Sequence, residues 1–99
     1  MSGGTASEAI ARLAERADPE RAAQNARYFK TGPGQYGEGD RFLGCTMTDV
    51  RAVARAFRDL PLDEVDALLD SPVHEHRTVG AILLATRFVP ALREKQVPP

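Results

Sequence analysis

The sequence predicts an all-α fold of about five helices arranged as antiparallel pairs, the architecture of a fragment of an α-solenoid. Apolar residues recur at spacings of three and four through most of the 99 residues. Residues that favour helix starts, Ser, Thr, Asp and Pro, precede each such stretch. No segment sustains the period-two alternation of a half-buried strand. The chain has no exact internal repeat, so the solenoid interpretation depends on helix pairing alone.

Two helices are expected before residue 30. Thr5 or Ser7 can cap the first helix, with Glu8 in its first turn. The second helix begins at Asp18–Pro19, where Asp is the N-cap and Pro takes the first helical position. The first apolar stripe consists of Ile10, Leu13, Ala14 and Ala17, and the second of Ala22, Ala23, Ala26 and Phe29.

Three more helices are expected after residue 45. Thr46 and Asp49 form a variant capping box for the third helix, Pro61 begins the fourth, and Ser71–Pro72 begins a fifth that runs roughly over 72–88. We expect the fifth helix to be buried on nearly all sides and Gly80 to allow close packing. The expected apolar positions are Val50, Val53, Ala54 and Phe57 in the third helix, Leu62, Val65, Leu68 and Leu69 in the fourth, and Val79 to Ala85 in the fifth.

A long glycine-rich segment, residues 28–44, separates the second and third helices. It carries five of the eight glycines and both tyrosines, and loops of this length are usually either functional or disordered. The GxxxxG spacing lacks the Lys-Ser/Thr pair of a P-loop, and the acidic residues Glu38 and Asp40 repel phosphate. We therefore expect these acidic side chains to bind loop N–H groups or to pair with Arg27 or Arg41. Positive φ or close backbone approach is expected at Gly32, Gly34, Gly37 and Gly39, and Gly44 is also expected to have a structural role.

Composition limits the classes of function. The single cysteine, Cys45, allows no intramolecular disulfide and no zinc-binding spacing, so we expect no metal and a reducing, cytoplasmic compartment. The N-terminus lacks the features of a signal peptide, and no apolar run approaches the ~20 residues that span a bilayer, so no membrane association is expected. We treat 1–99 as one segment of a larger repeat domain, with frayed ends at 1–6 and 93–99.

Charge is segregated along the chain. Residues 27–58 contain six basic and three acidic side chains, whereas residues 59–75 contain six acidic and no basic ones. A helical array with one basic edge is a candidate surface for phosphate. The alternative is that Arg55 and Arg58 pair with the acidic helix that follows.

Several segments together resemble the N-terminal region of the AlkD-like DNA alkylation repair proteins, over about residues 20–88. They are 26–30 (ARYFK), 31–40 (TGPGQYGEGD), 42–44 (FLG), 50–51 (VR) and 68–77 (LLDSPVHEHR). The resemblance implies HEAT-like helical repeats and a bacterial, nucleoid-associated DNA glycosylase that needs no metal and no cofactor. Such an enzyme hydrolyses the N-glycosidic bond of N3- and N7-alkylated purines in double-stranded DNA.

The catalytic carboxylate of that family lies in a Trp- and Asp-containing helix beyond the matched region. This chain has no Trp and stops at Pro99. We therefore expect no catalytic residue here and no base excision by this chain alone. The alternative function is a non-catalytic helical-repeat module for protein interaction. Self-association through an exposed apolar end is also expected.

The resemblance implies DNA contacts at Tyr28, Lys30, Thr46, Met47 and Arg51. The alternatives are that Tyr28 packs beneath the loop, Lys30 offsets the helix dipole, Thr46 serves only as a cap and Arg51 forms a surface salt bridge.

A structural role is expected for the start of the fifth helix, where His74, Glu75 and Arg77 form an inter-helix hydrogen-bond network. His74 and His76 are two residues apart and do not share a helix face, so they are not expected to bind a metal. Cys45 is expected to pack in the core beside Leu43.

Overall fold

The computed structural model describes residues 4–28 and 39–89, and the five named elements in these ranges are all helices. The all-α prediction is therefore confirmed. The helices are α1 (Ala6–Ala14), α2 (Pro19–Tyr28), α3 (Met47–Ala56), α4 (Leu62–Leu69) and α5 (His74–Phe88).

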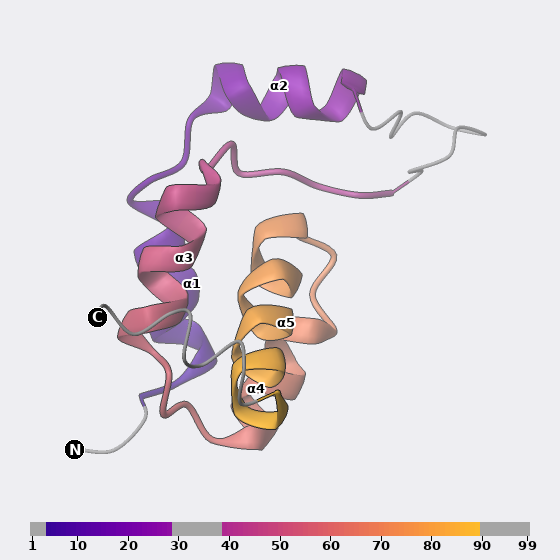
Figure 1. Cartoon of the computed structure of the whole chain (residues 1–99). Coiled ribbons are helices and arrows are strands. Elements are labelled where there is room, and N and C mark those ends of the chain that lie inside the picture. The colour runs from indigo at the N-terminus through magenta and orange to yellow at the C-terminus, as the bar shows by residue number, and fades with distance from the viewer. Residues whose placement is uncertain (1–3, 29–38, 90–99) are drawn as a thin grey trace.

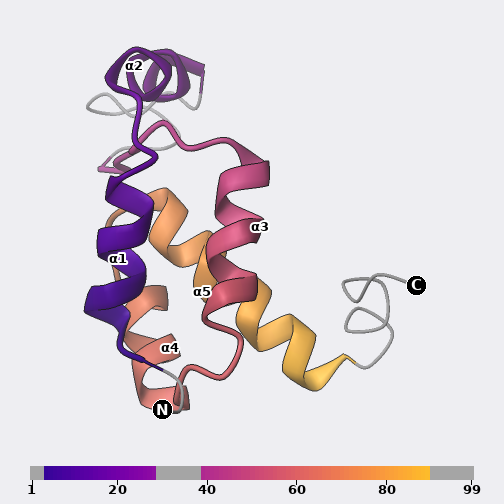
Figure 2. The ribbon, with the colours of Figure 1, turned by 90° about the vertical axis from the view of Figure 1, so that its left-hand side faces the viewer.

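Four of the helices form two antiparallel pairs, as predicted. Helix α1 runs against α3 and α4 against α5, and the pairs stack with α3 beside α5 and α1 beside α4 (Figures 1 and 2). Helix α2 differs, because it lies across one end of the stack and contacts no other helix of the described ranges (Figure 1).

The first three helices begin at the residues that the sequence indicated. The Thr5 hydroxyl accepts a hydrogen bond from the Glu8 N–H at 3.2 Å, and Asp18 Oδ1 accepts from the N–H groups two and three residues on. Thr46 and Asp49 form a complete capping box, in which the Asp49 N–H donates to Thr46 Oγ1 at 3.1 Å and the Thr46 N–H donates to Asp49 Oδ2 at 3.3 Å. The start of α1 has a further acceptor, because the Ala6 N–H donates to Glu64 Oε1 of α4 at 2.7 Å.

Helix α5 begins two residues later than predicted. Its N-cap is Val73, which provides no side-chain cap, and the first helical residue is His74. The Ser71 hydroxyl accepts from the Val73 N–H at 3.1 Å and lies 2.8 Å from Nδ1 of His76. The Ser71 side chain therefore stabilises the turn before the helix instead of capping the helix itself.

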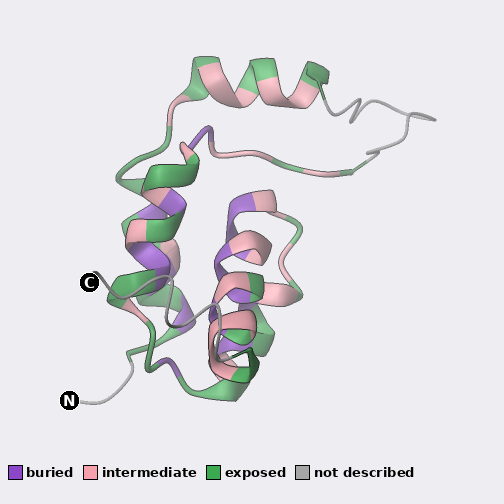
Figure 3. Ribbon diagram, in the orientation of Figure 1, coloured by how far each residue is buried: buried purple, intermediate pink, exposed green. Residues whose placement is uncertain are grey.

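The core lies between the two helix pairs (Figure 3). Its buried apolar residues are Ala6, Ala9, Leu13, Cys45, Val50, Val53, Ala54, Leu60, Val65, Leu68, Val79 and Leu83. Gly80 packs closely as predicted, since a Cβ atom there would lie 3.0 Å from Leu69 Cδ2 and 3.3 Å from Leu68 Cβ.

Several predicted core positions are wrong. Ala14, Ala17 and Leu62 are exposed, because α1 and α4 turn other residues toward the core. Helix α2 buries no residue, since it lies on a loop rather than on a helix, and Phe29 falls outside the described ranges.

Helix α5 is buried on one face only. Val79, Gly80 and Leu83 face the core, whereas Ala81, Leu84 and Phe88 are exposed, with Phe88 at 65%. The prediction of burial on nearly all sides is wrong because no described helix packs on the outer side of α5. An apolar stripe therefore remains on the surface.

Candidate nucleic-acid interface

The loop that precedes α3 is organised around one buried carboxylate, that of Glu75 in the first turn of α5. Glu75 is 2% exposed. Its Oε1 accepts from the Leu43 N–H at 2.9 Å, and its Oε2 accepts from the N–H groups of Gly44 at 2.9 Å and Cys45 at 3.2 Å. Three successive backbone N–H groups thus surround the carboxylate, an arrangement that favours an anion. These bonds offset the free energy lost when the charge leaves water.

Other residues of α5 bind the same loop. Arg77 donates to Asp40 Oδ1 at 2.7 Å and to the Ser71 carbonyl at 2.9 Å. The His74 N–H donates to the Arg41 carbonyl at 2.7 Å, and the His74 ring lies 4.9 Å from that of Phe42. The predicted network of His74, Glu75 and Arg77 thus joins helix to loop, not helix to helix. The partner of Asp40 is Arg77, and the predicted pairing with Arg27 or Arg41 is wrong.

The opposite side of the loop holds α2. The Asp18 N–H donates to the Leu43 carbonyl at 2.9 Å, and Arg21 Nη1 donates to the Gly44 carbonyl at 2.8 Å. Gly44 has a φ of +85°, and a Cβ there would lie 2.0 Å from the Asp18 carbonyl oxygen. Glycine is therefore required at position 44 both by the positive φ and by the close approach of the Asp18 backbone.

The other loop glycines divide into two groups. Gly39 also has a positive φ, +87°, but lies in open space. Gly32, Gly34 and Gly37 lie outside the described residues, as do Lys30 and Glu38.

The first turn of α3 already holds a negative charge. The Asp49 carboxylate accepts from the Thr46 N–H, and Arg16, in the turn after α1, donates to it at 2.9 Å. Hydrogen bonds from the side chain of Arg16 and from Thr46 hold the pKa of Asp49 below its usual value. A phosphate approaching this helix end meets an ionised carboxylate, so the free N–H groups there are a poorer anion site than the sequence indicated. The geometry of Thr46 is that of a cap.

One face of α3 is basic and exposed. Met47, Arg51 and Arg55 follow one another at intervals of four residues, and Arg58 lies just beyond the helix end. All four are exposed, and no ion pair between described residues includes these arginines. The alternative in which Arg55 and Arg58 pair with α4 is therefore not found in the described ranges.

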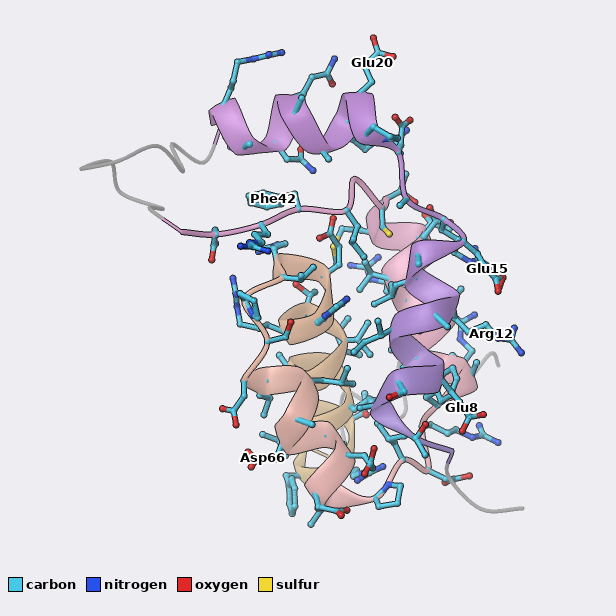
Figure 4. The ribbon with its side chains drawn as sticks, turned by 180° about the vertical axis from the view of Figure 1, so that it is seen from behind. Glu8, Arg12, Glu15, Glu20, Phe42 and Asp66 are labelled. Carbon is cyan, nitrogen blue, oxygen red and sulfur yellow. The ribbon has the colours of Figure 1, made fainter. Side chains whose placement is uncertain are left out.

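Tyr28 lies apart from this basic face. It is the last residue of α2 and is 78% exposed. The C-terminal end of α2 is on the side away from α3 (Figure 1). Ten residues of helix measure about 15 Å, so the structure does not bring Tyr28 together with Thr46, Met47 and Arg51. Figure 4 shows Phe42 beneath α2, between that helix and α5.

Two residues of this region were not singled out from the sequence. Arg16 connects the turn after α1 to α3, and Arg21 connects α2 to the loop. Arg21 stands three residues after the cap Asp18 and lies 3.7 Å from it, a spacing that could have drawn attention to it. Arg16 has no local signal, because its partner is 33 residues away.

Cys45 is buried in the core near Leu43, as predicted, and its thiol lies 3.4 Å from the Leu13 carbonyl oxygen. Burial, reinforced by the negative charges of Glu75 and Asp49, raises the pKa of this thiol to about 11. The thiol therefore behaves as a small core group and not as a nucleophile.

Within the described ranges, no three His, Cys, Asp or Glu side chains are placed to hold a metal ion. None of the described helices has the length and apolar character needed to cross a membrane.

Two stacked antiparallel helix pairs, one of which has an exposed arginine face, are consistent with a fragment of a helical-repeat protein. The model of a family described as DNA alkylation repair enzyme matches residues 9–97, and the chain belongs to this family. The match extends beyond the 20–88 inferred from the sequence. Comparisons with curated proteins and with solved structures found no match.

Proposed function

We propose that this chain supplies part of the DNA-binding surface of a glycosylase that removes N3- and N7-alkylated purines from double-stranded DNA. Family membership supports a role in DNA alkylation repair. The observation that carries the DNA-binding proposal is the exposed basic face of α3, whose arginines have no acidic partner among the described residues. The compartment that we propose for this role is a bacterial cytoplasm, at the nucleoid.

Arg51 is the central contact of this proposal. Its guanidinium suits a phosphate, since planar N–H groups can bind two oxygens at once. Met47 lies one turn before it and can contact a deoxyribose, whereas Thr46 contributes by fixing the helix start. Tyr28 and Lys30 are proposed to contact the DNA backbone elsewhere, since Tyr28 lies at the far end of α2 from α3 (Figure 1).

The experiment is a titration of an alkylated duplex at several salt concentrations. Arg51→Ala is expected to lower the affinity and to reduce the slope of log K against log salt by about 1. Arg12→Ala is the matched control, since Arg12 is an exposed arginine of α1 in the groove beside Ala52 and Ala56, outside the basic face. No binding by the unaltered chain at low salt would refute the DNA-binding proposal.

The chemical step is proposed to need a carboxylate from outside this chain. Glu75 is the most deeply buried carboxylate described, but both of its oxygens are bound by backbone N–H groups, so neither can face a sugar cation. We expect this polypeptide to release no base from a 7-methylguanine duplex above background. Base release above background would overturn this part of the proposal.

A second candidate function, protein interaction, is favoured by the apolar stripe of α5. Leu84, Phe88 and Val89 are exposed there, whereas the groove between α3 and the segment 12–16 carries the polar residues Arg12, Glu15 and Arg16. Terminal faces of helical arrays are usually polar, so we propose that a second copy of this chain covers the stripe. Sedimentation should show a dimer that Phe88→Glu dissociates and Arg12→Glu does not. A monomer at all concentrations would exclude it.

A further inference from the structure

We propose that Glu75 is a positioning residue for the nucleic-acid surface, because it fixes the loop that sets α2, and with it Tyr28, relative to the basic face of α3. The inference extends the DNA-binding proposal to a residue that does not itself contact DNA. It depends on that proposal only for its binding readout.

The first step is the isolation of α2. This helix buries no residue and contacts no other helix in the described ranges. The N-terminal half of this helix is attached to two loop residues: the Asp18 N–H binds the carbonyl of Leu43, Arg21 binds the carbonyl of Gly44, and the backbone of Gly44 packs against Asp18 and Ala22.

The second step is the attachment of the loop itself. The carbonyls of Leu43 and Gly44 point to α2, whereas their N–H groups point to Glu75. The same two peptide segments are therefore held from both sides. The next residues, Cys45 and Thr46, lead directly into α3, and the Cys45 N–H also binds Glu75. One carboxylate thus fixes the point from which α2 and α3 diverge.

The third step concerns what else could hold the loop. The ion pair of Arg77 with Asp40 and the bond from His74 to Arg41 lie two or more residues before Leu43, and the ring of Phe42, one residue before it, lies 4.9 Å from that of His74. None of these contacts binds the N–H groups of residues 43–45, which Glu75 holds. Removal of the Glu75 charge should therefore release α2, whereas the core formed by α1, α3, α4 and α5 should stay packed.

The test compares Glu75→Gln with Glu64→Gln. Glu64 is a matched control, since it also accepts a backbone N–H from a distant segment, at 2.7 Å, but at the opposite end of the bundle. Gln at position 75 keeps the size of the side chain but places an NH₂ group among three N–H donors. Hydrogen exchange of residues 19–28 and 43–45 should then accelerate at least tenfold, with α4 and α5 unchanged. Unchanged exchange of α2, or an equal increase in every helix, would overturn the proposal.

A binding measurement separates positioning from stability alone. In the unaltered chain Tyr28→Ala should weaken duplex binding at least threefold. In the Glu75→Gln background the same substitution should have no further effect, whereas in the Glu64→Gln background its effect should persist. A full Tyr28→Ala effect in the Glu75→Gln background contradicts the inference.

Two further outcomes are separated by the same experiments. If the unaltered chain binds no DNA, the proposed function fails and hydrogen exchange alone decides the role of Glu75. If Glu75→Gln does not fold, Glu75→Asp is judged by the same criteria, since it keeps the charge but withdraws it by one methylene.

Discussion

Gly44→Ala tests whether the loop and α2 are held as closely as the structure shows. An added Cβ would lie 2.0 Å from the Asp18 carbonyl oxygen and 2.7 Å from the Ala22 nitrogen, and both of these are backbone atoms that cannot rotate away. The φ of +85° is itself unfavourable for alanine, by about 1–2 kcal/mol. To relieve the contact, α2 must move away from the loop.

That movement breaks two hydrogen bonds, from the Asp18 N–H to Leu43 and from Arg21 to the Gly44 carbonyl. Each contributes about 0.5–1.5 kcal/mol net. Together with the backbone term, the free energy of unfolding should fall by about 2–5 kcal/mol. A domain is stable by only about 5–15 kcal/mol, so the loss is readily measured by urea unfolding.

Gly39→Ala is the matched control. Gly39 has nearly the same φ, +87°, but no atom lies within 4 Å of its expected Cβ. This variant should lose only the backbone term, about 1–2 kcal/mol. Equal losses in the two variants would refute the close contact between the loop and α2, since only Gly44 has backbone atoms against it.

Three other predictions follow from buried groups. Burial lowers the pKa of His76 below 6.5. Near that pH the unfolded chain therefore binds a proton that the folded chain does not, and the free energy of unfolding falls as the pH drops below about 6.5. His76→Asn should flatten this pH dependence of stability, as measured by urea unfolding. Because the pKa of Cys45 is about 11, a disulfide reagent at neutral pH should label the thiol only at the rate of unfolding, and rapid native labelling would contradict its burial. Gly80→Val should destabilise the α4–α5 contact by about 1–3 kcal/mol, visible as a lower thermal midpoint, because Leu68 and Leu69 leave no room for the added atoms.

The sequence predicted best what is decided locally. The Thr5 cap of α1, the Asp18–Pro19 start of α2 and the capping box of α3 depend on residues within three positions of one another, so their spacing is enough to predict them. The start of α5 was displaced because the Ser71 hydroxyl binds the turn instead of the helix, a choice that spacing does not reveal.

Long-range partners could not be predicted. Glu75 and Arg77 were recognised as structural, but their partners lie 30 to 37 residues away in a segment with several equivalent donors and acceptors. Helix α2 shows a similar limit. Its alanine spacing is the same whether the helix faces a core or a loop, so the pattern predicted a helix correctly and its surroundings wrongly. The basic face of α3 could be located from charge alone, but its lack of partners could not.

The hydrogen bond from the Ala6 N–H to Glu64 has a consequence for synthesis. The ribosome delivers the chain from its N-terminus, so α1 leaves the exit tunnel well before α4 is made. The first turn of α1 gains this acceptor only after Glu64 has emerged, 58 residues later. Helix α1 thus gains this acceptor only when the second pair assembles, which couples the folding of the two pairs.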